Sequence, residues 1–259
     1  MWIDSHCHMD SPLLYENSEK VFSECITEGV DSIIIPSVGK ENFDKVIKIA
    51  RKYKQCVYAL GFHPMYLSSF KDGDLDLLEH YLLNNDSVAV GEIGLDLFVK
   101  KNNLSVQESV FQSQLKIAEK FDLPVIMHVR GAIDLVLKNL RRVKVRGGIA
   151  HAFNGSFQQA DQLIELGFKL GFGGAMTYPR SKHIQALAKE LPIEAIVLET
   201  DSPDMPPAWL ENDESNQPKE LGKIAEFFCH LRGVDPSKTA DIIRINTIEA
   251  IPKLRELCT

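Results

Sequence analysis

Long hydrophobic runs are absent from this chain of 259 residues, and so is an excess of positive charge. No apolar stretch approaches the roughly 20 residues that a membrane-spanning helix needs, so we expect no membrane contact. The 29 lysines and arginines are outnumbered by 36 aspartates and glutamates, which gives a formal net charge of −7. This balance argues against a broad basic surface for duplex nucleic acid, although bound divalent cations can still reverse the field around a phosphate.

Paired cysteines and the common nucleotide and nucleophile motifs are also missing. The five cysteines are scattered and never form a CxxC pair, which favours reduced thiols over a disulfide framework; they are Cys7, Cys25, Cys56, Cys229 and Cys258. No GxGxxG, P-loop, GxSxG or HExxH pattern occurs, so nucleotide-binding, serine-hydrolase and zincin functions lack a starting motif. The chain opens on a metal-ligand motif that a cleavable signal peptide would discard, and we therefore expect a cytoplasmic location.

The chain instead alternates short apolar runs with amphipathic stretches. Runs typical of buried parallel strands lie at 2–8, 31–38, 56–64, 87–96, 124–130, 147–153, 168–176 and 195–203. Helical spacing marks 106–121, 132–143, 156–167 and 181–191 between them. Eight alternations predict a single (β/α)₈ TIM barrel over residues 1–259, with extra helices after Gln217 and a long loop at 209–218 over the site.

Side chains that bind metals stand near the ends of five of these predicted strands. The six candidate ligands are His6, His8, Glu92, His128, His151 and Asp201. Ligands from five strands converge only if the strands surround a common axis, as they do at the C-terminal mouth of a barrel. The pattern therefore predicts a metal-dependent hydrolase.

Strand alternation places Asp4, His6 and His8 on one face and turns Cys7 toward the core. Two imidazoles two residues apart can bind one divalent ion, and Asp4, one layer deeper in the barrel, would orient one of these ligands. Glu92 follows an apolar run in which an unpaired carboxylate is costly, and its two oxygens suit a bridge between two ions. The alternatives are a structural histidine pair and a glutamate paired with a basic residue.

Asp201 stands near the end of the last predicted strand and can act both as a ligand and as the acceptor of a proton from water. Glu199 shares its face but lies deeper, behind the ligands. His128 shares a strand face with Arg130, whose planar guanidinium either binds a phosphate or pairs with Asp134.

Two loops carry further candidates. His63, in GFHP, either contacts substrate or is an ordinary loop histidine. The polar segment 154–156, which follows His151, is placed to hold a substrate oxygen. The other histidines (His80, His183 and His230) fall in helical stretches and are expected to be solvated or packed.

Together these motifs resemble the TatD family of metal-dependent deoxyribonucleases, a branch of the amidohydrolase-like barrels. The resemblance runs along the whole chain, through DSHCHMD, GFHP, GEIGLD, PVIMHVR, AHAFNGS, LETDSPDMPP and NQPKELGKIAE. It implies one metal held by His6, His8, Glu92 and Asp201, a second held by Glu92, His128 and His151, and a functional His63. Members of the family are described as Mg²⁺-dependent exonucleases that act on single-stranded DNA from the 3′ end, and some relatives are thought to remove D-amino acids from tRNA.

We therefore expect a monomeric hydrolase with two divalent ions, of Zn, Mn, Mg or Co, acting on single-stranded DNA or another phosphodiester. A water activated across Glu92 would attack, Asp201 would receive its proton, and Arg130 and His63 would orient phosphate oxygens. The first alternative is an amide or ester hydrolase, including a D-aminoacyl-tRNA deacylase. The second is a metal-stabilised binding protein, which is disfavoured because structural zinc sites are usually closed and rich in cysteine.

Overall fold

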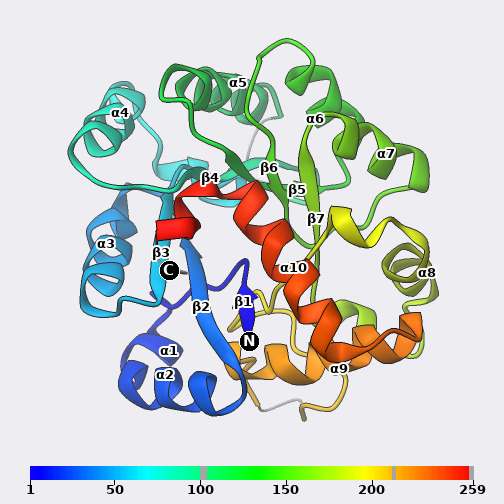
Figure 1. The fold of residues 1–259 in the computed structure, drawn as a ribbon. Coiled ribbons are helices and arrows are strands. Elements are labelled where there is room, and N and C mark those ends of the chain that lie inside the picture. The colour runs from blue at the N-terminus through cyan, green and yellow to red at the C-terminus, as the bar shows by residue number, and fades with distance from the viewer. Residues whose placement is uncertain (100–103, 212–213, 257–259) are drawn as a thin grey trace.

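Eight parallel strands follow one another round a barrel in chain order (Figure 1). The computed structural model describes residues 1–99, 104–211 and 214–256. The strands are β1 Trp2–Asp4, β2 Val30–Pro36, β3 Cys56–Leu60, β4 Ala89–Asp96, β5 Val125–Arg130, β6 Gly148–Ala150, β7 Phe168–Phe172 and β8 Ile196–Leu198. The ring closes where Ser5 N donates to Leu198 O at 3.1 Å and Asp201 N donates to His6 O at 2.9 Å. The predicted single-domain (β/α)₈ barrel is confirmed.

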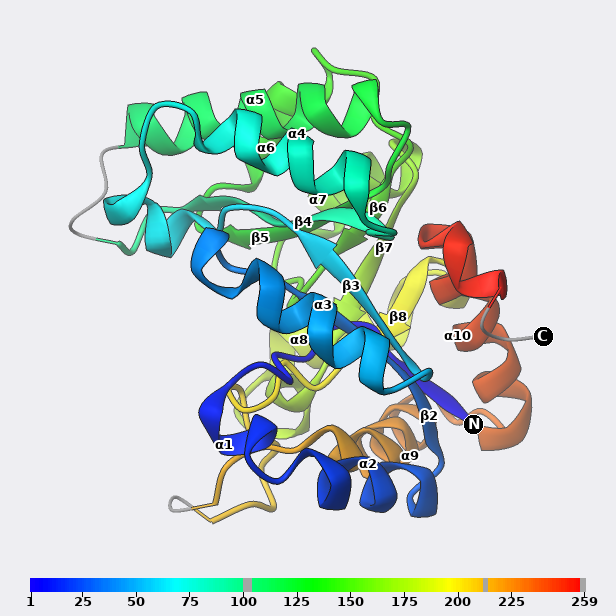
Figure 2. The ribbon, with the colours of Figure 1, turned by 90° about the vertical axis from the view of Figure 1, so that its left-hand side faces the viewer.

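Helices on the outside of the barrel cover the strands (Figure 2). They are α1 Pro12–Tyr15, α2 Ser18–Thr27, α3 Phe43–Lys52, α4 Asp74–Asn84, α5 Leu104–Lys120, α6 Ile133–Leu140, α7 Phe157–Glu165, α8 Lys182–Glu190, α9 Leu221–Arg232 and α10 Pro236–Ala250. Short 3₁₀ segments are η1 Lys40–Asn42, η2 Pro64–Ser69, η3 Gly174–Thr177, η4 Ile193–Ala195, η5 Pro218–Glu220 and η6 Pro252–Glu256. The four segments predicted from helical spacing correspond to α5, α6, α7 and α8.

The C-terminal helix α10 closes one end of the barrel. It lies across the ends at which the strands begin (Figures 1 and 2), and the Asn246 side chain donates to the carbonyls of Ile193 and Ile196 at 2.7 and 2.8 Å. Beyond it, Ile251 and Leu254 join the apolar cluster that fills the barrel interior. The extra C-terminal helices expected from the sequence are therefore confirmed, and the functional site is confined to the opposite end.

Two expectations from composition can be compared with the described residues. None of their helices is both long enough and apolar enough to cross a membrane. Four cysteines are free and buried, and Cys7 belongs to the core as its strand position predicted. Cys258 lies outside the described residues.

Candidate metal centre

All six predicted ligands reach the mouth of the barrel, but not all of them follow a strand end. His6 and His8 come just after β1, His151 just after β6, and Asp201 three residues after β8. Glu92 and His128 instead lie inside β4 and β5. The pairing of β4 with β5 continues past these two ligands toward the mouth of the barrel, and its last pair is Asp96 opposite Arg130.

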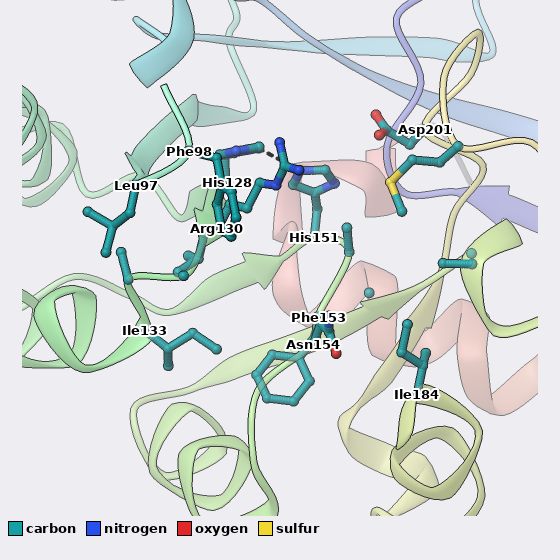
Figure 3. A pocket seen from close by; sticks show the side chains of 18 of the residues that line it. Leu97, Phe98, His128, Arg130, Ile133, His151, Phe153, Asn154, Ile184 and Asp201 are labelled. Carbon is teal, nitrogen blue, oxygen red and sulfur yellow. Dashed lines mark hydrogen bonds between the residues drawn. The ribbon is translucent and has the colours of Figure 1, made fainter. Parts of the chain in front are cut away.

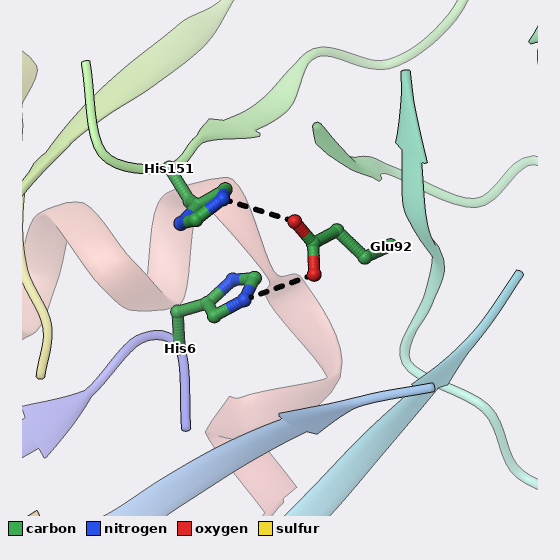
Figure 4. Close-up of side chains that lie close together, drawn as sticks. All are labelled: His6, Glu92 and His151. Carbon is green, nitrogen blue, oxygen red and sulfur yellow. Dashed lines mark ion pairs between the residues drawn. The ribbon is translucent and has the colours of Figure 1, made fainter. Parts of the chain in front are cut away.

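Glu92 is the centre of the group. Its Oε2 lies 3.2 Å from His6 Nε2 and 3.5 Å from His8 Nε2. Its Oε1 lies 2.9 Å from His151 Nε2 and 3.1 Å from His128 Nδ1. Figure 4 shows the carboxylate between His6 and His151, with one oxygen directed at each. Because each oxygen faces a different pair of imidazoles, this one carboxylate can serve two cations.

Asp201 completes the group around Oε2 of Glu92. Its Oδ1 lies 3.6 Å from both His6 Nε2 and His8 Nε2. Its backbone has φ +55, a left-handed conformation that costs free energy for a residue other than glycine. The hydrogen bond from its N–H to the carbonyl of His6 holds that conformation in place.

The protonation of these groups suits cation binding. Burial opposes the charge on Glu92, but the surrounding imidazoles outweigh it and hold the pKa of Glu92 well below its usual range. Burial lowers the pKa of His6 to about 3 and raises the pKa of Asp201 to about 6. For His8, Glu92 and Asp201 outweigh burial and raise the pKa to about 9. Glu92 is therefore anionic and His6 neutral, whereas a cation would displace a proton from His8.

Unsatisfied buried atoms show that these residues fit a metal. His6 Nε2 and Glu92 Oε2 are both buried and have no hydrogen-bond partner among the described residues. Leaving such atoms unpaired costs roughly 1–3 kcal/mol each, a penalty that a cation between them would remove. Three overlapping sets of ligand atoms, drawn from the six predicted ligands and His63, each lie within 4.8 Å of one another. Mixed imidazole and carboxylate donors of this kind are compatible with Zn, Mn, Co and Mg.

Carboxylates stand behind two of the histidines, and the one behind His128 is within hydrogen-bond distance. His128 Nε2 lies 3.0 Å from Asp96 Oδ2, so the other ring nitrogen, Nδ1, is the one directed at Glu92 and available as a metal ligand. His151 Nδ1 lies 3.6 Å from Glu199 Oε1, so Glu199 stands behind the ligands as predicted. Sequence analysis missed Asp96, although its position four residues after Glu92 places it on the same strand face.

Asp4 has a different role from the one predicted. Its carboxylate accepts the backbone N–H groups of His6 and Thr200 at 3.2 and 3.0 Å and the Thr200 hydroxyl at 2.6 Å. Asp4 therefore fixes the backbone on either side of the barrel seam and does not orient an imidazole ring. Burial raises its pKa to about 8.

His63 enters the site as a hydrogen-bond donor. Its Nδ1 accepts the N–H of Met65 at 3.1 Å, so the proton of the neutral ring resides on Nε2. Nε2 lies 3.2 Å from Glu92 Oε1. Burial lowers the pKa of His63, which favours this neutral form. In this tautomer His63 can donate to the Glu92 carboxylate or to another oxygen in the site.

Arg130 does not form the ion pair with Asp134 that was one of its two predicted interactions, and its contact with a phosphate stays a prediction. No ion pair among the described residues joins it to Asp134, which instead accepts a hydrogen bond from Gln159 at 2.8 Å. The guanidinium lies over the ring of Phe98, with Cζ 4.5 Å from the ring centroid. Arg130 lines the cavity next to the candidate ligands.

In the polar loop at 154–156, hydrogen-bonding groups of two of the three residues already have partners within the protein. The Ser156 hydroxyl accepts the N–H of Gln159 at 3.1 Å, and the Gln159 side chain accepts the N–H of Ser156 at 2.9 Å, forming a capping box at the start of α7. The carbonyl of Gly155 accepts a hydrogen bond from His183 at 2.8 Å, which gives His183 a packed role. Of the three loop residues, Asn154 alone lines the cavity.

The loop at 209–218 was expected to lie over the site, but none of its described residues lines the cavity; the segment just before it does. Asp204 and Met205 line the cavity. Asn216 holds this segment by donating to the carbonyls of Thr200 and Asp204 at 2.7 and 2.8 Å. Further along, Trp209 donates to the Glu220 side chain at 2.8 Å, and positions 212 and 213 lie outside the described residues.

Replacing Asp96 with asparagine is expected to weaken cation binding at the His128 side by about 10- to 100-fold, because loss of the charge lowers the basicity of His128. Calorimetric titration of metal-free protein with Zn²⁺ or Mn²⁺ measures the effect. Asp122→Asn is a matched control, since Asp122 is exposed and pairs with Arg146 away from the site. Unchanged affinity in Asp96→Asn would show that this carboxylate does not support His128.

The barrel and its ring of imidazole and carboxylate donors define a metal-dependent hydrolase. A family model described as TatD related DNase matches residues 3–251, and the chain belongs to the TatD family. It is 37% identical over 249 residues to the uncharacterized metal-dependent hydrolase YjjV of Escherichia coli (strain K12), covering 95% of this chain and 96% of that protein. The crystal structure of YjjV, a TatD homolog, superposes with a TM-score of 0.93 at 36% identity, covering 97% of this chain and 98% of the other. A proposed deoxyribonuclease of Danio rerio, tatdn3, is 27% identical over 268 residues and covers 98% of both chains.

Proposed function

We propose that this hydrolase cleaves phosphodiester bonds at the 3′ ends of single-stranded DNA with the help of two divalent cations. One cation would be held by His6, His8, Asp201 and Oε2 of Glu92, and the other by His128, His151 and Oε1 of Glu92. The observation that carries the proposal is the division of the Glu92 carboxylate, whose two oxygens each face a separate pair of imidazoles. Bound cations would activate water and neutralise the charge that develops on the phosphate.

The chain's own residues supply the remaining chemistry. Asp201 is the proton acceptor for the attacking water, because burial raises its pKa to about 6 and so makes it a stronger base than an exposed aspartate. His63 donates from Nε2 toward the site, and Arg130 offers hydrogen-bond donors to a non-bridging phosphate oxygen. Each of these groups would act on the terminal phosphodiester and its nearest neighbour.

The charge distribution favours recognition of strand ends over long tracts of duplex. The net charge is −7, and Asp134 and Asp204 line the same cavity as Arg130. Few phosphates can be contacted, so the salt dependence of binding should be shallow, with a slope of about 0.7 for each contacted phosphate on a single strand. The description of the matching family model and the name of the Danio rerio relative support DNA as the polymer.

A panel of substrates tests the proposal directly. The metal-loaded protein should degrade 3′-labelled single strands and frayed ends faster than blunt duplex. 4-Nitrophenyl esters, simple amides and aminoacyl esters should be poor substrates. Turnover of amides or aminoacyl esters, with no phosphodiester cleaved under any metal, would replace this proposal with the amide or ester hydrolase.

Arg130→Ala is expected to lower kcat/KM for single-stranded DNA by about 10- to 100-fold, which corresponds to loss of a charge-assisted contact of roughly 1.5–3 kcal/mol. Steady-state kinetics with metal-saturated protein measure the change. Arg141→Ala removes the same charge from an exposed position beside Gln162 and should leave kcat/KM unchanged. Equal effects of the two substitutions would show that Arg130 acts only through net charge.

A further inference from the structure

A cavity of about 1110 Å³ opens beside the candidate metal centre and has two chemically different ends. One end is formed by His128, His151 and Asp201. The other end is mostly apolar, and Figure 3 shows Ile133, Phe153 and Ile184 on that side, away from the metal-ligand groups, with Asn154 as a polar neighbour of Phe153. A cavity that joins cation ligands to an apolar chamber is suited to a ligand with an anionic part and an apolar part.

The floor of the apolar end is built into the fold. A Cβ at Gly155 would lie 2.5 Å from Ile133 Cδ1 and 2.8 Å from Phe153 Cζ, so these two side chains close over the glycine. The hydrogen bond from His183 to the Gly155 carbonyl ties the same loop to α8, which also carries Ile184. The chamber is therefore preformed, since its lining is fixed by packing and by hydrogen bonds.

An exposed aromatic ring stands at the rim of the cavity. Phe98 is 64% exposed, although its ring is held against Arg130 and next to Gly131, where a Cβ would lie 3.1 Å from the ring. The N–H of Phe98 donates to Asp96 Oδ1 at 2.8 Å, and Asp96 also contacts His128. The backbone of Phe98 is therefore tied to the residue behind a candidate metal ligand, and its ring rests against Arg130 while it stays largely exposed.

We propose that this cavity is a substrate subsite for an aromatic or planar apolar group attached to the scissile phosphate. In a nucleic-acid substrate that group is the base of the terminal nucleotide, which is joined to the scissile phosphate through its deoxyribose. The inference rests on the proposed phosphodiester hydrolysis for the identity of the anionic part, and on the cavity for the apolar part. A fixed, exposed phenyl ring at the rim suits stacking by a base, an interaction that tolerates different bases.

The binding of two phosphonates tests the subsite independently of whether the protein cleaves a phosphodiester. Methylphosphonate and phenylphosphonate present the same anionic group to the cations and differ only in the group that would enter the chamber. Calorimetry with Mn²⁺- or Zn²⁺-loaded protein should show that phenylphosphonate binds at least about tenfold more tightly than methylphosphonate, as expected for burial of an aromatic ring. Ile184→Asn should reduce this preference to about twofold or less, because it places an amide in the chamber. Phe98→Ala should also reduce it and, being at an exposed position, should leave the fold intact.

Ile245→Asn is the matched control, because Ile245 is exposed on α10 at the opposite end of the barrel, and it should retain the full preference. Equal affinities of wild-type protein for the two phosphonates would overturn the subsite, even if DNA were cleaved. Retention of the wild-type preference by both Ile184→Asn and Phe98→Ala would overturn it as well. A clear phenyl preference without cleavage of any phosphodiester would instead support the subsite and remove the proposed reaction.

Discussion

Asp201→Asn is expected to lower kcat by about 10²- to 10⁴-fold, the range typical of losing a general base. The amide keeps the shape of the side chain and one oxygen that can face His6 and His8, but it is a very poor proton acceptor. The fold should survive, because asparagine tolerates the left-handed conformation found at this position better than most residues. Steady-state kinetics should be measured together with elemental analysis of the same sample.

Asp204→Asn serves as the control for Asp201, since Asp204 lines the same cavity outside the candidate metal-ligand groups. It should change kcat by less than about tenfold. Wild-type kcat in Asp201→Asn, with full metal occupancy, would contradict the assignment of Asp201 as the base. A loss of activity that tracks a loss of metal would assign Asp201 to cation binding alone.

Glu92→Gln is expected to have the second large effect, because it removes the carboxylate shared by both groups of ligands. Wild-type protein loaded with excess Mn²⁺ or Zn²⁺ and then desalted should contain about two equivalents of metal, as in other two-metal sites. The variant should retain less than one equivalent and lose most activity, since glutamine carries no charge and turns an NH₂ group toward imidazoles that must act as ligands.

Glu220→Gln is a suitable control for this experiment. Glu220 is also buried but binds Trp209, so its substitution should preserve both equivalents of metal. Two equivalents in Glu92→Gln would rule out Glu92 as the bridge. A single equivalent in fully active wild-type protein would do the same.

Much of this architecture can be predicted from sequence because it depends on short-range patterns. Apolar runs and helical spacing identify all eight strands, and strand alternation distinguishes His6 from Cys7. The same rule applies to Asp96, but its signal was obscured because it stands at the end of the predicted strand, where a carboxylate usually marks a loop. The role of His63 depends on the N–H of Met65 and on Glu92 from another strand, and such backbone geometry has no pattern in the sequence.

The apolar chamber is harder to predict for a similar reason. Phe98, Ile133, Phe153 and Ile184 come from four separate segments, and each one fits the ordinary pattern of a loop or an amphipathic helix. Their common function arises only when the barrel brings the loops together. For the polar segment at 154–156 the sequence suggested too much. Ser156 and Gly155 were expected to be open to a substrate oxygen, but they cap α7 and bind His183 of α8.

The position of α10 has a consequence for how the protein folds. Ile3 at the start of the chain shares one apolar cluster with Ile251 and Leu254, which follow α10. The barrel interior therefore stays open to water until these two segments, far apart in the sequence, have come together. Contacts between such distant segments form slowly and leave apolar surface exposed in the meantime, which makes the partly folded chain prone to aggregation. Closure of the barrel interior is consequently a late step of folding, and the segment that follows α10 is the part that ends the exposure of its apolar surface.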